Sequence, residues 1–374
     1  MADPLNSLTV AILQLVSMSF LRCGASIFKM EGNGTEVNCT GLHLPFQYSL
    51  YAITYIVVFI PGLLANSTGL WVLWRFISKK NKAIIFMINL AIADLAHVLS
   101  LPLRIYYYIN HHWPFPRFLC LFCFYLKYLN MYASICFLTC ISLQRCFFLL
   151  KPFKARNWKR RYDIAISATI WITVGAACLP LLVMRSASLA NTSSETCFAD
   201  LAVRHIDMTS SIAMITVAEL GGFVIPVGVI AFCTWKTMKS LQDYQMPPQN
   251  NSEKEKALRM VLMCAMVFFI CFTPYHINFP IFMMLKQDLF SSCSFMKSIL
   301  CFHIISLCLA SMNCCLDPLV YYFMTAEFRD RLSPRGLMNI LSRFTPNSNN
   351  FGFNRRQEEL QTITFELLDD LKPL

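Results

Sequence analysis

The chain has 374 residues, of which 56% are hydrophobic and 14% are charged. Because soluble proteins usually carry about 25% charged residues, this composition excludes an ordinary soluble domain and predicts an integral membrane protein. The net charge of +11 gives no reason to expect a nucleic-acid partner, since the basic residues gather in the connections between apolar segments.

The amino-terminal segment, residues 1–47, contains an apolar run over 8–21 that resembles the core of a signal peptide. Asp3 precedes this run where a basic residue is usual, so cleavage and retention both stay open, as does a start at Met30. A glycosylation sequon at Asn66 falls inside an apolar segment and is expected to be a chance match. The sequons expected to be glycosylated outside the cell are Asn33, Asn38 and Asn191.

Seven apolar segments follow, and each is long enough to cross a bilayer as a helix, which takes about 20 residues. They cover 48–74, 83–103, 118–144, 164–184, 208–235, 260–285 and 298–324. The sequence therefore predicts an all-α membrane protein whose central domain, 48–324, is a seven-transmembrane helix bundle. The remainder, 325–374, is expected to be cytoplasmic, with a short interfacial helix over 327–332 and a disordered polar tail.

Lysine and arginine residues predict the orientation of the chain. The connections after segments one, three and five hold 16 of them, whereas the other three connections hold 6. Because strongly cationic connections stay in the cytoplasm, we expect the amino terminus outside and the carboxyl terminus inside, in the plasma membrane. The cationic connections would then face the anionic lipid of the inner leaflet.

Four fully charged residues lie inside the segments: Asp94, Lys127, Glu219 and Asp317. A charge at the centre of a membrane helix costs roughly 2.5–3.5 kcal/mol on insertion scales, so it survives where it is paired, hydrated or used. Each of the four is therefore predicted to be functional.

Cysteines and prolines add two further expectations. The exterior is oxidising, so Cys120, at the outer end of segment three, and Cys197 suit one disulfide, and Cys39 and Cys293 suit another. Prolines inside the segments predict kinks or hinges, with simple adaptation to lipid as the alternative. They are Pro61, Pro102, Pro180, Pro226, Pro274 and Pro318.

Each of the seven segments also carries a short motif. The motifs are Leu63-Leu64-Ala65-Asn66, Leu90-Ala91-Ile92-Ala93-Asp94-Leu95, Cys120 with Arg145, Trp171, Pro226, Cys271-Phe272-Thr273-Pro274 and Asp317-Pro318-Leu319-Val320-Tyr321. In this order they resemble the signatures of the rhodopsin-like G-protein-coupled receptors over about 48–330.

Within that family, the stretches 101–107 and 272–276 resemble the purinergic nucleotide branch, and 124–134 resembles its lysophosphatidylserine-responsive members. The resemblance implies an extracellular ligand, a heterotrimeric G protein and arrestin as partners, membrane lipid around the helices, and no cofactor. It also implies the Gα twelve/thirteen class, with Gi as the alternative.

Two cations and several phenols are predicted to face an outer cavity. Lys127 lies seven residues inward from Cys120, which is about 10 Å at 1.5 Å per residue and corresponds to ligand depth. Cations among phenols suit a phosphate group. The alternatives are that Arg104 extends outward to the head groups and that Lys127 pairs with Glu219. The candidate ligand-binding residues are Arg104, Tyr107, Tyr108, Lys127, Tyr128, Tyr132, Arg185, Glu219, His276, Phe279 and Lys286.

Two of these residues bear on the type of ligand. By resemblance, His276 faces the cavity, and helix packing is the alternative role. Purinergic receptors usually carry a base three residues later, where this chain has Phe279. The exchange removes a phosphate ligand and adds apolar surface, so it favours a lipid chain over a nucleotide. Glu219 is expected to meet the ammonium of a zwitterionic serine head group.

Asp94 and Asp317 belong to a second set, which resembles the sodium pocket and activation switch of the family. A sodium ion at Asp94 is the one metal expected, and a packing role for the two acids is the alternative. The predicted switch residues are Asn66, Asp94, Ser134, Asn313, Asp317, Tyr321, Phe272 and Pro274.

Arg145 ends segment three, where the family arginine engages the G protein. Its neighbours depart from the usual pattern, because Gln144 replaces an acid and Cys146 replaces a tyrosine. Thr234 likewise occupies the place of a tyrosine in segment five. Without the acid, the resting salt bridge to Arg145 is missing, so the sequence predicts elevated basal signalling.

Other classes of membrane protein fit less well. A retinal protein needs a lysine in segment seven, where the corresponding residue is Ser311, and an amine receptor needs a carboxylate where Lys127 stands. A transporter would show an internal repeat, and an enzyme would show a catalytic constellation. We therefore predict a receptor for an extracellular anionic lysophospholipid, with a nucleotide receptor coupled to Gi or Gq as the alternative.

Overall fold

The structure is a computed structural model, and it describes residues 46–74, 84–190, 197–198, 208–242, 248–285, 287 and 292–324. Several predictions lie outside these residues. They concern the signal-like run, Met30, the sequons at Asn33, Asn38 and Asn191, Cys39 of the second disulfide, Lys286 and the segment after 324. The side chain of Cys293 is likewise outside the described part.

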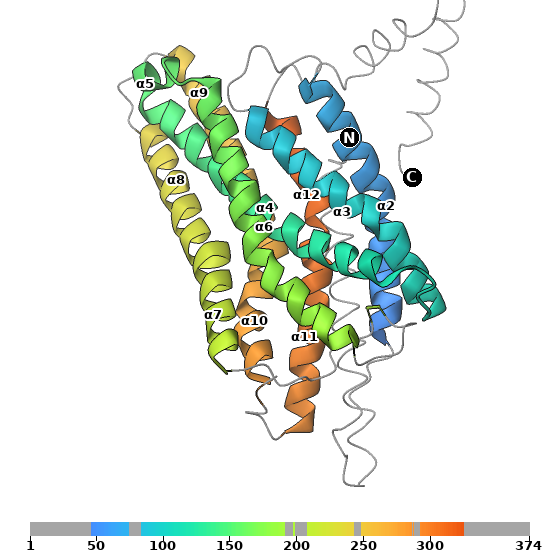
Figure 1. Cartoon of the computed structure of the whole chain (residues 1–374). Helices are drawn as coiled ribbons and strands as arrows, with labels where there is room; N and C mark the ends of the chain where they lie inside the picture. Colours follow the sequence, from blue (N-terminus) through green and yellow to red (C-terminus); the bar gives the residue numbers. More distant parts are fainter. Residues whose placement is uncertain are drawn as a thin grey trace, which may run out of the picture. The chain divides into compact units, whose positions relative to one another are not determined.

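The described residues form helices and short connections, without a β-strand, and Figure 1 shows the helices running side by side. Seven spans are long and apolar enough to cross a membrane, which confirms the predicted fold class. The single-helix spans are α2 (Phe46–Val72), α3 (Ile84–Asn110), α4 (Arg117–Leu150) and α6 (Arg160–Ala190). The composite spans are α7 (Met208–Glu219) with η3 (Leu220–Val224) and α8 (Ile225–Gln242), α9 (Pro248–Val267) with η4 (Phe268–Phe272) and α10 (Thr273–Leu285), and α11 (Cys293–Ser311) with α12 (Asn313–Met324).

The helices run further than the apolar segments that predict them. Helix α3 continues to Asn110 and α4 to Leu150, beyond the predicted ends at 103 and 144. The physical reason is that hydropathy marks only the hydrocarbon core, whereas backbone hydrogen bonding continues through the head-group layer. A further short helix, α5 (Pro152–Arg156), lies in the connection between α4 and α6.

Two of the six prolines follow a local widening of the helix. Pro226 and Pro274 are the second residues of α8 and α10, and each follows a five-residue π-helix, η3 or η4. The N–H groups of Ile225 and Thr273 donate to carbonyls five residues earlier, on Leu220 and Phe268. A proline lacks the N–H that would close the next α-helical bond, and a π-turn is a common way for a helix to accommodate this loss.

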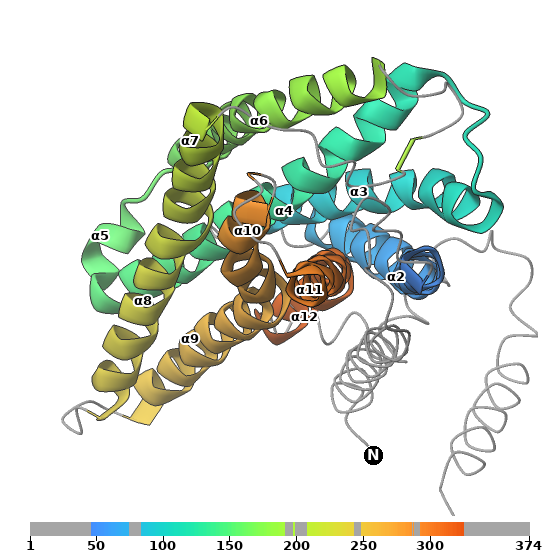
Figure 2. The same ribbon diagram turned by 90° about the horizontal axis from the view of Figure 1, so that it is seen from below.

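The spans differ in how deeply they are enclosed. Span 294–321, which contains most of α11 and α12, is 94% buried in its most apolar window, whereas the window of span 208–241 is 17% buried. Figure 2 shows α11 and α12 between α2, α3 and α10, with α6, α7 and α8 along one side. Helices α6, α7 and α8 therefore expose many of their apolar side chains to the lipid.

Polar side chains tie these helices together at a few points. The indole nitrogen of Trp171 in α6 donates to Asn89 Oδ1 in α3 at 2.8 Å, and the Tyr125 hydroxyl in α4 donates to the Gly175 carbonyl at 3.0 Å. Asn66 is fully buried and donates to the Cys314 carbonyl at 2.7 Å. Interhelical bonds of this kind stabilise membrane bundles by about 0.6 kcal/mol on average. The burial also confirms that the Asn66 sequon is a chance match.

Candidate ligand and switch sites

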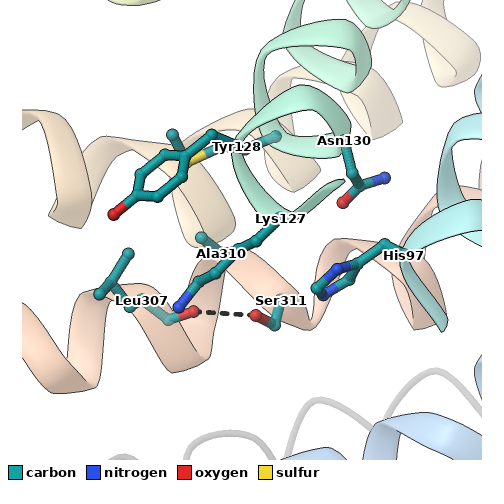
Figure 3. Close-up of a pocket in the computed structure, with 8 residues that line it drawn as sticks. His97, Lys127, Tyr128, Asn130, Leu307, Ala310 and Ser311 are labelled. Atoms are coloured by element: carbon teal, nitrogen blue, oxygen red, sulfur yellow. Dashed lines mark hydrogen bonds between the residues drawn. The ribbon is translucent and has the colours of Figure 1, made fainter. Parts of the chain in front are cut away.

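A small cavity, about the size that holds one water molecule, lies between α3, α4 and α11. Figure 3 shows Lys127 extending from α4 across this space toward α11, with His97 on the α3 side. The Ser311 hydroxyl turns back to the Leu307 carbonyl at 3.1 Å. The lining residues are His97, Lys127, Tyr128, Asn130, Met131, Leu307, Ala310 and Ser311.

Lys127 points toward the tyrosines of α2. Its ammonium nitrogen lies 3.4 Å from the Tyr55 hydroxyl and 5.3 Å from the centre of the Tyr51 ring. Glu219 contacts His276 instead, so the alternative in which Lys127 pairs with Glu219 is wrong. The lysine is half-buried at the cavity, where an ammonium group attracts anions strongly.

Arg104 is almost completely buried, with 2% of its surface exposed. The alternative in which it extends outward to the head groups is therefore wrong. Its guanidinium group donates to the Cys123 carbonyl and lies 4.5 Å from the Phe198 ring centre and 5.9 Å from that of Tyr55. Tyr55 is thus a neighbour of both predicted cations, Arg104 and Lys127.

The predicted disulfide between Cys120 and Cys197 is present, with a sulfur–sulfur distance of 2.04 Å. It ties Cys197 to the first turn of α4 and so places Phe198 beside the side chains of α3. Arg185 donates to the Cys197 carbonyl and lies 5.6 Å from the Phe124 ring centre. The disulfide therefore organises the outer rim around two of the predicted basic residues.

Tyr107 and Tyr108 are buried in an aromatic cluster beneath this connection. Their ring centres lie 5.4 Å and 6.0 Å from that of Phe198, and Tyr108 also stacks on Tyr51 at 4.8 Å. Such aromatic pairs contribute about 0.5–1.5 kcal/mol beyond their buried area. The two tyrosines hold the outer wall together, and their rings connect Phe198 with the tyrosines of α2.

A separate group joins α4, α7, η3 and α10. His276 Nδ1 lies 3.2 Å from Glu219 Oε1, and its ring stacks on Phe223 at 5.5 Å and meets Tyr132 edge-on at 5.9 Å. Gly222 lies directly beside both rings, since a β-carbon there would be 2.6 Å from Tyr132 and 2.8 Å from His276. Among the described residues, the predicted ligand residues thus include one group beside Lys127 and another around His276.

Phe279 is 6% exposed and stacks on Tyr275, with ring centres 5.4 Å apart. Phe279 therefore contributes an apolar ring to this part of α10, as expected from the sequence. Nearby, the Asn278 amide lies 3.2 Å from the His303 ring nitrogen, and His303 stacks on Phe282 at 3.9 Å.

Three of the polar residues beside these predicted positions are absent from the sequence-based set: His97, Asn278 and His303. The cost of a buried charge points only to fully charged residues, and His276 belongs to the set through the family resemblance instead. His97 carries a usable signal, because it lies three residues after Asp94 and so shares its helix face. Asn278 and His303 carry no comparable local signal, since their contact joins residues on two separate helices.

Several of the predicted switch residues meet between α3, α4 and α12. Asp94 Oδ1 accepts hydrogen bonds from Asn130 at 2.8 Å and from Asn313 at 3.2 Å, and the Asn313 amide also reaches Ser134 and Asp317 at 3.1 Å and 3.3 Å. All five side chains are buried. The second oxygen of Asp94 and the Oδ1 atom of Asp317 have no hydrogen-bond partner among the described residues.

These unpartnered oxygens provide a test of the predicted sodium ion. A buried carboxylate oxygen without a donor is unfavourable, whereas hard cations such as sodium prefer oxygen ligands. Two carboxylates and the Ser134 hydroxyl in one cluster therefore fit a monovalent cation. No group of three histidine, cysteine or acidic side chains that could hold a metal occurs among the described residues.

Phe272 and Tyr321 are fully buried in the switch region, and Pro274 follows η4 as described above. Thr234 donates to the Ile230 carbonyl of its own helix at 2.8 Å. The Tyr321 hydroxyl has no hydrogen-bond partner among the described residues. Thr234 therefore does not contact Tyr321 in the way expected of the tyrosine whose place it takes.

Comparison with known proteins places this architecture in a family. Residues 65–321 match the family described as 7 transmembrane receptor (rhodopsin family). A human protein named as a putative purinoceptor, number 10 of its series, is 67% identical over 312 residues, which are 83% of this chain and 91% of that protein. The human Probable G-protein coupled receptor 174 is 49% identical over 308 residues, 82% of this chain and 92% of that protein.

A more distant relative carries a lipid in its name. The human Lysophosphatidic acid receptor 6 is 32% identical over 327 residues, covering 87% of this chain and 95% of that protein. The family match covers more than half of the chain, and these relatives are covered almost in full. The chain belongs to the rhodopsin family of seven-transmembrane receptors, in its purinergic and lysophospholipid-like branch.

Proposed function

We propose that the chain is a plasma-membrane receptor for an extracellular anionic lysophospholipid of the lysophosphatidylserine type. The observation that carries this proposal is that Lys127 and Arg104 are both close to Tyr55 inside the bundle, with Arg104 also against the disulfide-anchored Phe198. Family membership supports a small-molecule or lipid agonist and a G protein as partners.

The charges suit a phosphodiester head group. In the low dielectric of the bundle, a buried guanidinium and a half-buried ammonium attract a phosphate much more strongly than exposed cations do. The cavity at Lys127 is about the size that holds one water molecule, so a phosphate head group would enter it only with movement of the side chains that line it. The acyl chain would lie against apolar side chains such as Phe279.

Glu219 and His276 are proposed to meet the serine part of the head group. Their contact at 3.2 Å places a carboxylate in the membrane beside a group that can donate a hydrogen bond. An ammonium from the ligand would join this pair and bring a full positive charge to Glu219. Arg185 and Lys286 would contribute positive charge near the outer rim.

The names of the relatives support lipid and nucleotide ligands to different degrees. The relative at 32% identity is named for lysophosphatidic acid, and the relative at 67% identity is named as a purinoceptor. A nucleotide is therefore the second candidate. Phe279 favours the lipid, because a phenyl ring stacked on Tyr275 cannot bind a nucleotide phosphate by charge.

The inner half is proposed to carry the switch and the G-protein contact. Asp94, Asp317, Ser134 and Asn313 would hold sodium in the resting state, and Arg145 would engage the G protein, of the Gα twelve/thirteen class, with Gi as the alternative. The amino-terminal segment 1–47 would lie outside, and the tail 325–374, with arrestin as a further partner, would lie inside.

The decisive experiment is a titration of lysophosphatidylserine, lysophosphatidic acid and nucleotides in cells that report each Gα class. We expect the serine-headed lipid to act at the lowest concentration and Lys127→Ala to abolish its effect. Lys236→Ala provides the control, because Lys236 lies on α8 against Trp235, far along the chain from the cavity residues. If a nucleotide activates the receptor and the lipids do not, the proposal is wrong.

A second comparison tests the role of Glu219. Glu219→Gln keeps the size of the side chain and removes its charge, so it should lower the potency of the serine lipid more than that of lysophosphatidic acid, which has no ammonium. Equal effects on both lipids would contradict the proposed contact with the ammonium group.

A further inference from the structure

The inner end of α4 lacks the carboxylate that the family usually places before Arg145, because residue 144 is glutamine. The structure nevertheless holds a carboxylate at this end of the helix, and it comes from α6. Asp163, in the first turn of α6, is fully buried, and its Oδ1 atom accepts a hydrogen bond from Gln144 Nε2 at 2.9 Å.

The same oxygen accepts a second hydrogen bond from the connection between the two helices. The indole nitrogen of Trp158 donates to Asp163 Oδ1 at 2.8 Å. The Trp158 ring packs 5.6 Å from Phe147, at the end of α4, and 5.4 Å from Tyr162, at the start of α6. One carboxylate therefore joins the end of α4, the connection 151–159 and the start of α6.

The buried carboxylate of Asp163 depends on the two hydrogen-bond donors, Gln144 and Trp158. A buried carboxylate is unfavourable unless donors surround it, and hydrogen bonds to a charged acceptor are roughly twice as strong as neutral ones. A glutamine can donate to Asp163, whereas an acidic residue at 144, as in the family pattern, would face it as a second carboxylate in place of this donor. The glutamine at 144 and the aspartate at 163 thus form a matched pair.

We propose that Asp163 is a positioning residue for G-protein coupling, which holds the connection 151–159 against the inner end of α4 through Gln144 and Trp158. This connection contains α5, whose Phe153 is 88% exposed, together with Lys154 and Arg156. The carboxylate fixes the segment that follows Arg145 and leaves the pairing of the arginine independent of residue 144. The proposal rests on G-protein coupling and is independent of the identity of the ligand.

The hydrogen-bonding chemistry of Gln144 and Asp163 predicts which substitutions of similar size break their contact and which combination restores it. Gln144→Glu sets two carboxylates against each other and should release the connection. Asp163→Asn alone should be mild, because the Gln144 amide can rotate and offer its oxygen to the new amide. In the double variant, the new amide at 163 accepts from Trp158 with its oxygen and donates to the new carboxylate at 144 with its nitrogen, so the contact is restored.

The test uses the purified full-length receptor without ligand, as wild type, the two single variants and the double variant. Amide hydrogen exchange over 147–162 measures the order of the connection, and titration with one nucleotide-free heterotrimeric G protein measures coupling. We expect faster exchange and about ten-fold weaker G-protein binding in Gln144→Glu only, with both properties restored in the double variant. Asn157→Asp is the matched control, since it adds one carboxylate at an exposed position of the same connection.

The outcomes separate the proposal from simple structural damage and from failure of the ligand assignment. Damage alone would leave the double variant at least as defective as Gln144→Glu, and that result would overturn the proposal. Equal binding, or no binding, by all four receptors would overturn its functional part. The ligand titration described above can fail without any effect on this measurement.

Discussion

Gly222 provides the sharpest test of how the outer groups are packed. A β-carbon at this position would lie 2.6 Å from Tyr132 Cε1 and 2.8 Å from His276 Cε1, whereas one at the adjacent Gly221 would meet nothing within 4 Å. Both glycines lie in η3, and both neighbours of Gly222 are ring atoms that cannot yield by rotating a flexible chain end. Gly222→Ala and Gly221→Ala are therefore a matched pair.

The expected magnitude follows from the difference between the two variants. Replacing a helical glycine by alanine stabilises a helix by roughly 0.5–1 kcal/mol, and this gain is common to both positions. Overpacking of a filled site costs about 1–3 kcal/mol and applies only to Gly222. We therefore expect the free energy of unfolding of Gly222→Ala to be about 1–3 kcal/mol below that of Gly221→Ala.

Both variants are assayed by thermal unfolding in one detergent at one scan rate, since membrane receptors often unfold irreversibly. Gly222→Ala should unfold at a lower temperature than Gly221→Ala. It should also respond to the lysophospholipid with lower potency, because it displaces Tyr132 and His276 together. Equal unfolding temperatures would refute the close approach of η3 to α4 and α10.

Three further predictions concern the switch, the outer rim and the helix contacts. Asp94→Asn removes the charge of the partly unpartnered carboxylate and should abolish the effect of sodium on agonist affinity; a surviving effect, measured against N-methylglucamine, would contradict the cation site. Cys120→Ser loses a disulfide that spans 77 residues and should cost about 2–5 kcal/mol, seen as low surface expression by flow cytometry. Trp171→Phe breaks the 2.8 Å bond to Asn89 and should lower stability by about 0.6 kcal/mol; a loss several times larger would indicate a further role for the indole.

The sequence is sufficient to predict the fold because membrane spans have a strong and local signal. Seven apolar stretches, separated by cationic or cysteine-bearing connections, predict seven helices, and the structure contains seven such spans. The pairing of Cys120 with Cys197 is likewise predictable, since the distribution of lysine and arginine predicts both residues on the oxidising side. The additional turns of α3 and α4 are not, because hydropathy ends before the helix does.

The partners of the buried charges are harder to predict. A membrane helix is apolar on nearly every side, so its sequence carries a weak signal for the face that turns inward. The rotation of α4 decides that Lys127 meets Tyr55 and that Glu219 is left to His276. The contact between Gln144 and Asp163 also lacks a periodic signal, because an irregular connection separates the two residues.

Asn130 connects the proposed ligand cavity with the switch cluster. It lines the cavity beside Lys127 and donates to Asp94 at 2.8 Å and to Ser134 at 3.4 Å. A ligand shifts a two-state receptor only by its different affinity for the two states. A head group that competes for the Asn130 amide would bind less well while Asp94 retains that donor. We therefore expect the ligand and Asp94 to compete for the amide of this one side chain on α4, without a long chain of intervening contacts.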